Sequence, residues 1–163
     1  MANKCLDAVI GDPGTYTIRA ESKMPGDAVL LVIRDGGRYI LNYGSFCNAL
    51  KGLINSASAP TYVIARNEQG VVIGVSGIMF DKNIKKQIIA SGFVVTAREI
   101  RGYGVGKALI RYSIDVAEEN RAVFIANVDE NNMASRKTME SAGMRVESIC
   151  TKRNNTTIRY TTQ

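Results

Sequence analysis

The sequence contains no histidine and no tryptophan among its 163 residues, and it has only three cysteines and three prolines. Without histidine, neither Ser-His-Asp nor Cys-His catalysis can operate, and the commonest protein ligand of transition metals is missing. The cysteines, Cys5, Cys47 and Cys150, are odd in number and widely spaced, which argues against a disulfide framework or a zinc site. Any catalysis must therefore work without imidazole, and no metal is expected.

Long hydrophobic runs are also missing. The best of them, residues 28–33, is far shorter than the ~20 residues that a membrane-spanning helix needs. The N-terminal stretch shows neither the basic region nor the apolar region of a signal peptide. We therefore expect a cytoplasmic protein without a membrane partner. The length and the 45% content of hydrophobic residues predict a single domain over residues 1–163.

Acidic residues are scarce where basic residues gather. The formal net charge is +6, and seven basic residues but only one acidic residue, Glu99, fall between positions 82 and 111. A second basic stretch covers residues 145–159. Such clusters are usually solvated surface, but they also suit an anionic ligand or a nucleic acid. Charge alone does not choose among these interpretations.

Strand patterns dominate the first part of the chain. Residues 15–21 alternate as in a strand, whereas residues 28–54 predict either a hairpin around Asp35-Gly36-Gly37 or a strand followed by a helix. Two apolar, β-branched runs, 60–66 and 71–80, flank a glycine-containing turn and predict a hairpin. A further strand over residues 85–96 is expected to be broken or bulged near Ser91-Gly92.

Helices and strands alternate in the second part. Apolar residues recur at helical spacing over 105–116, and residues 122–128 form the continuous apolar run of a buried strand. A helix over 131–143 is expected to be capped by Asn131 or Asn132 and stopped by its final glycine. Two closing strands should meet around Asn154-Asn155. This order predicts a sheet covered on both faces.

Three alternating glycines precede the first of these helices, in the string Arg101-Gly102-Tyr103-Gly104-Val105-Gly106. A Walker phosphate loop does not fit, because Arg101 stands where its first glycine belongs and Ala108 where its hydroxyl belongs. A dinucleotide-binding turn does not fit either, because it requires Gly-x-Gly-x-x-Gly. Glycines at a helix N-terminus nevertheless let backbone N–H groups converge on a pyrophosphate.

The glycine string fits the pattern Arg/Gln-x-x-Gly-x-Gly/Ala, and in this it resembles the GNAT superfamily of acetyl-CoA-dependent N-acetyltransferases. The resemblance covers roughly residues 60–150, and "NMASRKTMESAGM" resembles the ribosomal-protein-acetyltransferase branch. It implies an α/β fold with a mixed, mostly antiparallel central sheet of about six to seven strands, helices on both faces and a splayed parallel pair at the cofactor site. Residues 1–60 show no usable resemblance and are expected to form the substrate-side portion.

The resemblance also implies roles for individual residues. The pyrophosphate of acetyl-CoA would lie on Arg101, Gly102, Tyr103, Gly104, Val105, Gly106 and Lys107. The backbone N–H groups of Val94, Val95 and Thr96 would hold the pantetheine arm and polarise the thioester carbonyl. Asn132 and Ser135 would lie at that arm or at the attacking amine.

The position of the tyrosine that serves many members of the superfamily as general acid is occupied by Met139. A thiol with a pKa near ~8.5 leaves tolerably as a thiolate, so this loss matters less than it would for an alkoxide. The residues we predict for the chemistry are Ser135 and Glu99, the carboxylate nearest to the glycines. An ion pair with Arg98 or Arg101 is the alternative role for Glu99.

The sequence therefore predicts an enzyme that transfers an acetyl group from acetyl-CoA to a primary amine by direct attack. A protein or peptide amine ranks first as acceptor, because residues 1–60 lack the acidic bias that would favour a small cationic substrate. The alternatives are a small-molecule amine acetyltransferase and a non-catalytic protein that binds coenzyme A or nucleic acid. A nucleoprotein substrate and a homodimer are both compatible with the sequence.

Overall fold

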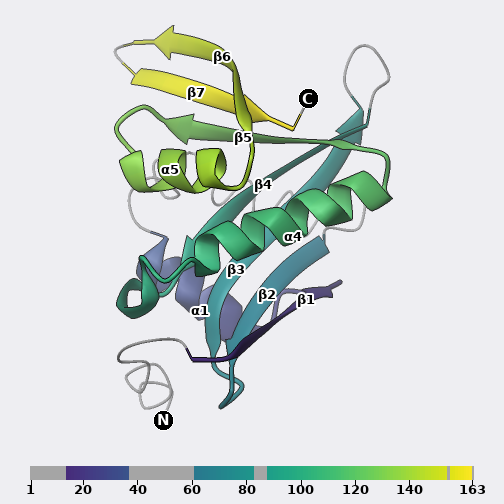
Figure 1. Cartoon of the computed structure of the whole chain (residues 1–163), viewed down its shortest axis with the longest axis vertical. Helices are drawn as coiled ribbons and strands as arrows, with labels where there is room; N and C mark the ends of the chain where they lie inside the picture. Colours follow the sequence, from purple (N-terminus) through teal and green to yellow (C-terminus); the bar gives the residue numbers. More distant parts are fainter. Residues whose placement is uncertain (1–13, 37–60, 83–87, 154, 163) are drawn as a thin grey trace.

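The computed structural model describes residues 14–36, 61–82, 88–153 and 155–162. Within these ranges the chain forms a seven-stranded sheet and three α-helices (Figure 1). The strands are β1 (Tyr16–Glu21), β2 (Thr61–Asn67), β3 (Val72–Lys82), β4 (Ile88–Thr96), β5 (Val123–Asp129), β6 (Arg145–Lys152) and β7 (Asn155–Thr161). The helices are α1 (Gly26–Asp35), the 3₁₀ helix η1 (Arg98–Ile100), α4 (Val105–Glu119) and α5 (Met133–Ser141).

The strands follow the order β1-β2-β3-β4-β5-β7-β6, and all neighbours are antiparallel except β4 and β5, which are parallel. Helices α4 and α5 lie on one face of the sheet, and α1 lies on the other (Figure 1). The predicted mixed sheet, with one parallel pair and helices on both faces, is thus confirmed. None of the helices in the described ranges is long and apolar enough to cross a membrane.

The predicted hairpin between β2 and β3 is confirmed, and its turn is fixed locally. The Gly70 N–H donates to the Asn67 carbonyl at 2.9 Å, and the Asn67 side chain accepts the Val71 N–H at 2.9 Å. Gly70 has a φ of +76°, which suits glycine. The hairpin supplies two neighbouring interior strands of the sheet, in which residues 62–65 and 72–78 are buried.

Residues 26–35 form helix α1, so both predicted versions of this segment, hairpin and strand, are wrong there. The buried positions Ala28, Leu31, Val32 and Asp35 recur at helical spacing. Leu30 and Ile33 lie between them and are apolar although they are exposed. The sequence therefore shows a continuous apolar run, which is the pattern of a buried strand. The remainder of the predicted hairpin or helix, residues 37–54, lies outside the described residues.

Strand β4 is not broken near Ser91-Gly92 in its pairing with β3, so the predicted break is wrong for that pairing. The pairing of β3 with β4 runs without a register shift from Gly74 opposite Thr96 to the far end of both strands. Gly92 serves a close approach of the strands, because a Cβ at this position would collide with the Gly77 carbonyl oxygen. The interruption occurs instead at the other edge of β4, where its pairing with β5 ends at Ser91.

Helix α4 confirms the predicted helix and packs closely across β3. Its buried face contains Val105, Leu109, Ile110, Ser113, Val116 and Ala117. A Cβ on Gly74 would lie only 2.7 Å from Leu109 Cδ1, so glycine allows this helix to approach the sheet. The buried Ser113 hydroxyl is 3.0 Å from the Ser76 hydroxyl and 2.8 Å from the Leu109 carbonyl oxygen. Helix and sheet are therefore joined by a satisfied polar contact within the core.

The C-terminal elements also follow the prediction. Asn132 is the N-cap of α5, because its Oδ1 accepts the Ser135 N–H at 3.2 Å. After the helix, Gly143 has a φ of +93°, and Met144 turns into the core. Strands β6 and β7 form the closing hairpin, although Asn154 at its turn lies outside the described residues.

Candidate active site

The parallel strands β4 and β5 pair over only a short distance. Their register runs from Ile89 opposite Val123 to Ser91 opposite Ile125, although β4 continues to Thr96 and β5 to Asp129. Beyond Ser91 the two strands diverge, as Figure 1 shows between the labels β4 and β5. The backbone groups on the facing edges of the diverging segments therefore have no strand partner across the gap.

The hydrogen-bond alternation of β4 identifies which of these groups face β5. The Ala97 N–H donates to the Ile73 carbonyl at 2.9 Å. Because alternate residues of an antiparallel pair exchange hydrogen bonds, the backbone of Val95 also faces β3. The N–H groups of Val94 and Thr96 then point away from β3, toward the side where β5 diverges. Among the three residues predicted to hold the pantetheine arm, Val94 and Thr96 are thus better oriented than Val95.

Strand β5 contributes a backbone group that the sequence reasoning missed. The Glu130 N–H donates to the Thr156 carbonyl at 2.9 Å, which directs the backbone of alternate β5 residues toward β7. Asn127 lies between two of the residues that face β7, so its backbone N–H and carbonyl point away from β7, into the gap between β4 and β5. Asn127 is exposed within a mostly buried strand, so a polar residue in an apolar run was the available signal.

The glycine loop leads from β4 into α4 and leaves open space beside its backbone. Gly102 and Gly104 have φ angles of +92° and +85°, a region that favours glycine. A Cβ built at either position would meet no atom within 4 Å. The first helical hydrogen bond of α4 is the one from the Ala108 N–H to the Gly104 carbonyl, at 3.0 Å. The N–H groups of Val105, Gly106 and Lys107, in the first turn, are thus available to an anion at the positive end of the helix dipole.

The site thus combines a short parallel strand pair, backbone N–H groups of β4 that face the gap to β5, and a glycine loop at the N-terminus of α4. A family model described as the acetyltransferase (GNAT) family matches residues 34–144. The chain belongs to the GNAT acetyltransferase family. Acetyl-CoA is accordingly its acetyl donor. The family model matches from residue 34, whereas the resemblance read from the sequence motifs begins only near residue 60.

Solved structures agree with the family in fold. A phosphinothricin acetyltransferase of Sinorhizobium meliloti in complex with acetyl-CoA is 18% identical, with a TM-score of 0.67, over 90% of this chain and 87% of that chain. A spermidine N-acetyltransferase of Vibrio cholerae is 18% identical (TM-score 0.65; 90% and 92% covered). A ribosomal-protein-S5-alanine acetyltransferase of Vibrio fischeri is 14% identical (TM-score 0.66; 90% and 91% covered). Among curated protein sequences, none matches this chain significantly.

In this GNAT protein, α5 lies beside the start of α4. A Cβ on Gly106 would lie 3.5 Å from Thr96 Cγ2 and 3.7 Å from Thr138 Cγ2, so β4, α4 and α5 meet there. Ser135 lies in the first turn of α5 and is half-buried. Met139, at the position where the resemblance places a tyrosine, is 3% exposed, so a thioether occupies this place in the core.

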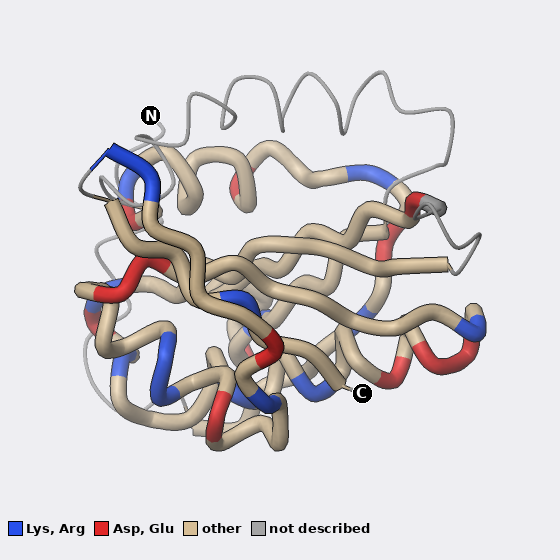
Figure 2. The backbone as a smooth tube through the Cα atoms, turned by 90° about the horizontal axis from the view of Figure 1, so that it is seen from above, with Lys and Arg blue, Asp and Glu red and all other residues tan. Residues whose placement is uncertain are grey.

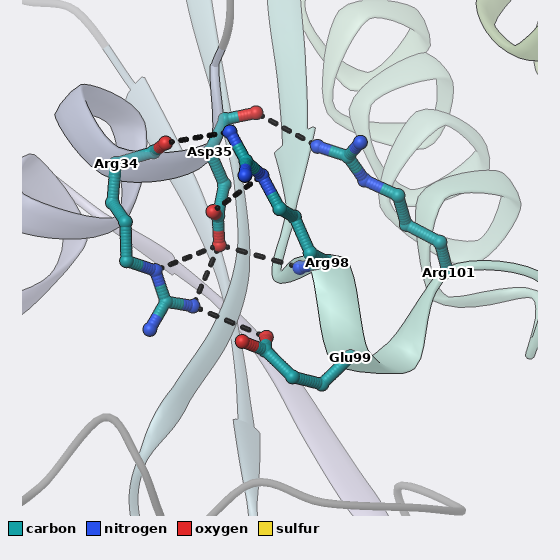
Figure 3. A network of polar contacts seen from close by, with 5 residues as sticks. All are labelled: Arg34, Asp35, Arg98, Glu99 and Arg101. Carbon is teal, nitrogen blue, oxygen red and sulfur yellow. Dashed lines mark hydrogen bonds and ion pairs between the residues drawn. The ribbon is translucent and has the colours of Figure 1, made fainter.

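The charged residues around the loop are arranged differently from the sequence prediction. The Arg101 Nη2 donates to the Asp35 carbonyl oxygen at 2.7 Å, so this guanidinium is directed to the end of α1. Glu99 accepts a hydrogen bond from Arg34 Nη2 at 3.2 Å, which holds it on the α1 side of the loop. Figure 3 shows these side chains gathered between α1 and η1. Because Arg101 is directed to α1, Lys107 in the first turn of α4 is the next cation in the sequence that could serve the glycine loop.

Two buried tyrosines remain protonated at neutral pH. Burial raises the pKa of Tyr62, and burial is also the main cause that raises the pKa of Tyr160. The Tyr160 hydroxyl on β7 donates to Glu140 Oε1 of α5 at 2.9 Å. This hydroxyl therefore joins the sheet to α5, and it does not occupy the position of the missing tyrosine acid.

Proposed function

We propose that this protein transfers the acetyl group of acetyl-CoA to a primary amine by direct attack, without a covalent enzyme intermediate. The observation that carries the proposal is the divergence of β4 from β5 beside the glycine loop. The N–H groups of Val94 and Thr96 point away from β3, so they face the gap that this divergence opens. When bound, acetyl-CoA supplies an acetyl group activated as a thioester, which the amine takes as the thiolate leaves.

The chain's own groups can hold both ends of this coenzyme. The open space beside Gly102 and Gly104 fits a pyrophosphate, and the α4 N-terminus and Lys107 supply positive charge. Backbone N–H groups at Val94 and Thr96 match the amides and the thioester carbonyl of the arm, where they stabilise developing negative charge. Donors fixed in a strand need no reorganisation during the reaction.

Of the two side chains predicted for the chemistry, Ser135 is the better placed. It lies at the start of α5, the helix that meets β4 and α4 near Gly106. Glu99 is engaged by Arg34, so its use as a base would require this ion pair to open. We therefore assign Ser135 and the Asn132 cap to the neighbourhood of the attacking amine, and we assign Glu99 a structural role.

A protein or peptide amine is our first choice of acceptor. The α5 sequence supports it, because this helix carries the resemblance to the ribosomal-protein-acetyltransferase branch, and one structural neighbour acetylates a ribosomal-protein alanine by its name. Other neighbours are named for spermidine and phosphinothricin. These names agree on acetyl transfer rather than on one class of acceptor, so the small amines belong in the test.

Nucleic-acid binding is weakened as an alternative. Within the described residues of the basic stretch 82–111, Arg98 pairs with the Asp35 carboxylate, which balances part of the charge, and Arg101 is directed to the Asp35 carbonyl group. Figure 2 shows Lys and Arg in several separate groups with Asp and Glu between them. A nucleic-acid surface is expected to be one continuous basic stripe or face.

The test is calorimetric titration with acetyl-CoA of the unmodified protein, Gly104→Glu and Gly70→Glu. Both glycines have positive φ and open space around them, but Gly70 lies in the β2–β3 turn and not in the loop that leads into α4. We expect binding to be lost in Gly104→Glu and retained in Gly70→Glu. Thiol release is then followed with a peptide bearing a free α-amine, an N-blocked lysine peptide and spermidine. If the unmodified protein does not bind acetyl-CoA, the proposal fails.

A further inference from the structure

Asp35 is a buried carboxylate in an unfavourable place. It is the last residue of α1 and is only 3% exposed. A helix C-terminus carries partial negative charge, so a carboxylate there is repelled by the helix dipole. Burial adds a desolvation cost unless the charge is paired. The partners that offset these two costs therefore show what Asp35 does.

The partners come from α1 itself and from η1, the segment just before the glycine loop. Arg34 donates to Asp35 Oδ2 from Nε at 3.0 Å and from Nη2 at 2.6 Å. The same oxygen accepts the backbone N–H of Arg98 at 3.3 Å, and Oδ1 lies 3.3 Å from Arg98 Nε. Figure 3 shows the carboxylate between the two arginines. Residues 63 positions apart are thus joined through one buried charge.

Backbone carbonyl groups at the end of α1 strengthen the same connection. Arg101 Nη2 donates to the Asp35 carbonyl at 2.7 Å, and Arg98 Nη2 lies 3.5 Å from the Arg34 carbonyl oxygen. The last carbonyl groups of a helix have no partner within the helix, and cations are favoured beside them. The two arginines therefore cap α1 while they hold residues 98–101 against it.

This connection ends where the glycine loop begins. Arg101 is followed by Gly102 and Gly104, which are exposed and have open space beside them. Glycines are conformationally free, so the position of the loop depends on the segments that fix its two ends. One end is the first turn of α4, and the other is the segment held by Asp35.

We propose that Asp35 is a positioning residue for the coenzyme. Its carboxylate fixes residues 98–101 on α1 and so determines where the N–H groups between Gly102 and Gly106 converge. Arg101 acts through α1 and not by contact with a phosphate. This inference rests on the proposed placement of the pyrophosphate on the glycine loop.

The experiment measures the Kd of acetyl-CoA for the unmodified protein, Asp35→Asn, Arg101→Gln and the double variant. Asp27→Asn is the matched control, because it removes an ion-paired carboxylate from the other end of α1. We expect a loss of between about tenfold and a hundredfold in Asp35→Asn, the scale of small misplacements in a binding site. The double variant should lose less than the product of the two single losses, because the Asp35 carboxylate and the Arg101 bond to the Asp35 carbonyl group both hold residues 98–101 on α1. Asp27→Asn should bind as the unmodified protein does.

Two further measurements separate positioning from general stability and from phosphate contact. In the coenzyme-free Asp35→Asn protein, the amide NMR signals of Gly102, Gly104 and Gly106 should shift while those of β5 stay in place. The salt dependence of binding should fall much less in Arg101→Gln than in Lys107→Gln, because a charge in contact with the phosphates contributes most to the screened attraction.

Several outcomes would overturn the inference. They are unchanged binding in Asp35→Asn, losses that multiply in the double variant, or a salt dependence that falls as much in Arg101→Gln as in Lys107→Gln. The last measurement applies even if Asp35→Asn fails to fold, because Arg101 is exposed. A lack of acetyl-CoA binding by the unmodified protein would instead refute the proposed function, so the two failures are distinguishable.

Discussion

Replacing single residues of β4 by proline tests the assignment of the donor groups. Proline removes a backbone N–H, and its effect depends on where that N–H points. The backbone N–H of Val95 points to β3, where Val95 pairs with Val75, whereas the N–H of Val94 points to the gap between β4 and β5. Val94→Pro should therefore remove a donor to the coenzyme, and Val95→Pro should remove a hydrogen bond of the sheet. Val94→Ala and Val95→Ala control for the loss of each side chain.

The expected magnitudes differ in kind. In Val95→Pro the lost hydrogen bond and the buried carbonyl left without a partner cost roughly 2–4 kcal/mol of unfolding free energy. For a chain of this size each kcal/mol lowers the Tm by about 2–4 °C, so the Tm should fall by about 4–16 °C. In Val94→Pro the Tm should stay within a few degrees of Val94→Ala. Its acetyl transfer should instead fall by roughly 10²–10³-fold if this N–H meets the developing negative charge.

Calorimetry and thermal unfolding of the four variants provide the assay, with thiol release for the rate once an acceptor is known. Equal destabilisation by both prolines would show that the alternation is assigned wrongly. A stable Val94→Pro protein with unchanged coenzyme affinity and unchanged rate would refute the placement of the arm beside β4.

Two further outcomes follow from the structure. Cys150 is exposed, so Cys150→Ser should keep full acetyl transfer, and acetyl-cysteine detected at this position by mass spectrometry would contradict direct attack. Tyr160 has a pKa raised above 10.0 by burial, so the folded state holds its proton more tightly than the unfolded state does. Stability from this group is present below pH ~10 and is lost as pH rises through the folded pKa. Denaturant unfolding between pH 8 and pH 11 should therefore show a steeper loss in the unmodified protein than in Tyr160→Phe.

The sequence was most informative where local patterns decide the structure. The hairpin around Asn67 and Gly70, the helix after Gly104 and the cap at Asn132 all depend on residues close together in the chain. Helix α1 was mistaken because Leu30 and Ile33 are apolar but exposed, which hides the helical spacing of the buried residues. Periodicity cannot distinguish a short buried strand from a short helix that is apolar on most sides.

Contacts between distant segments could not be predicted from these patterns. The motif predicted that Arg101 reaches the coenzyme, but its guanidinium contacts Asp35, 66 positions earlier. Likewise, Asn127 appeared only as a polar residue in an apolar strand until the pairing of β5 with β7 showed which way its backbone faces. The acceptor and the homodimer stay predictions, and so does the substrate-side role of residues 1–60, of which residues 1–13 and 37–60 lie outside the described structure.

The absence of histidine and of the tyrosine acid limits what the acceptor can be. With Met139 buried at the position where the resemblance places the tyrosine, we expect the coenzyme to leave as a thiolate, which a thiol pKa near ~8.5 allows. The harder step is deprotonation of the amine: for a lysine with a pKa near ~10.4, forming the neutral amine at about pH 7.4 costs roughly 4 kcal/mol. An α-amine with a pKa near ~7.8 requires only about half a kcal/mol. Because Glu99, the carboxylate nearest to the glycines in the sequence, is engaged by Arg34, an α-amine is the acceptor that requires least help from a catalytic base. The peptide with a free α-amine should therefore react faster than the N-blocked lysine peptide, and this difference should narrow as pH rises toward the lysine pKa.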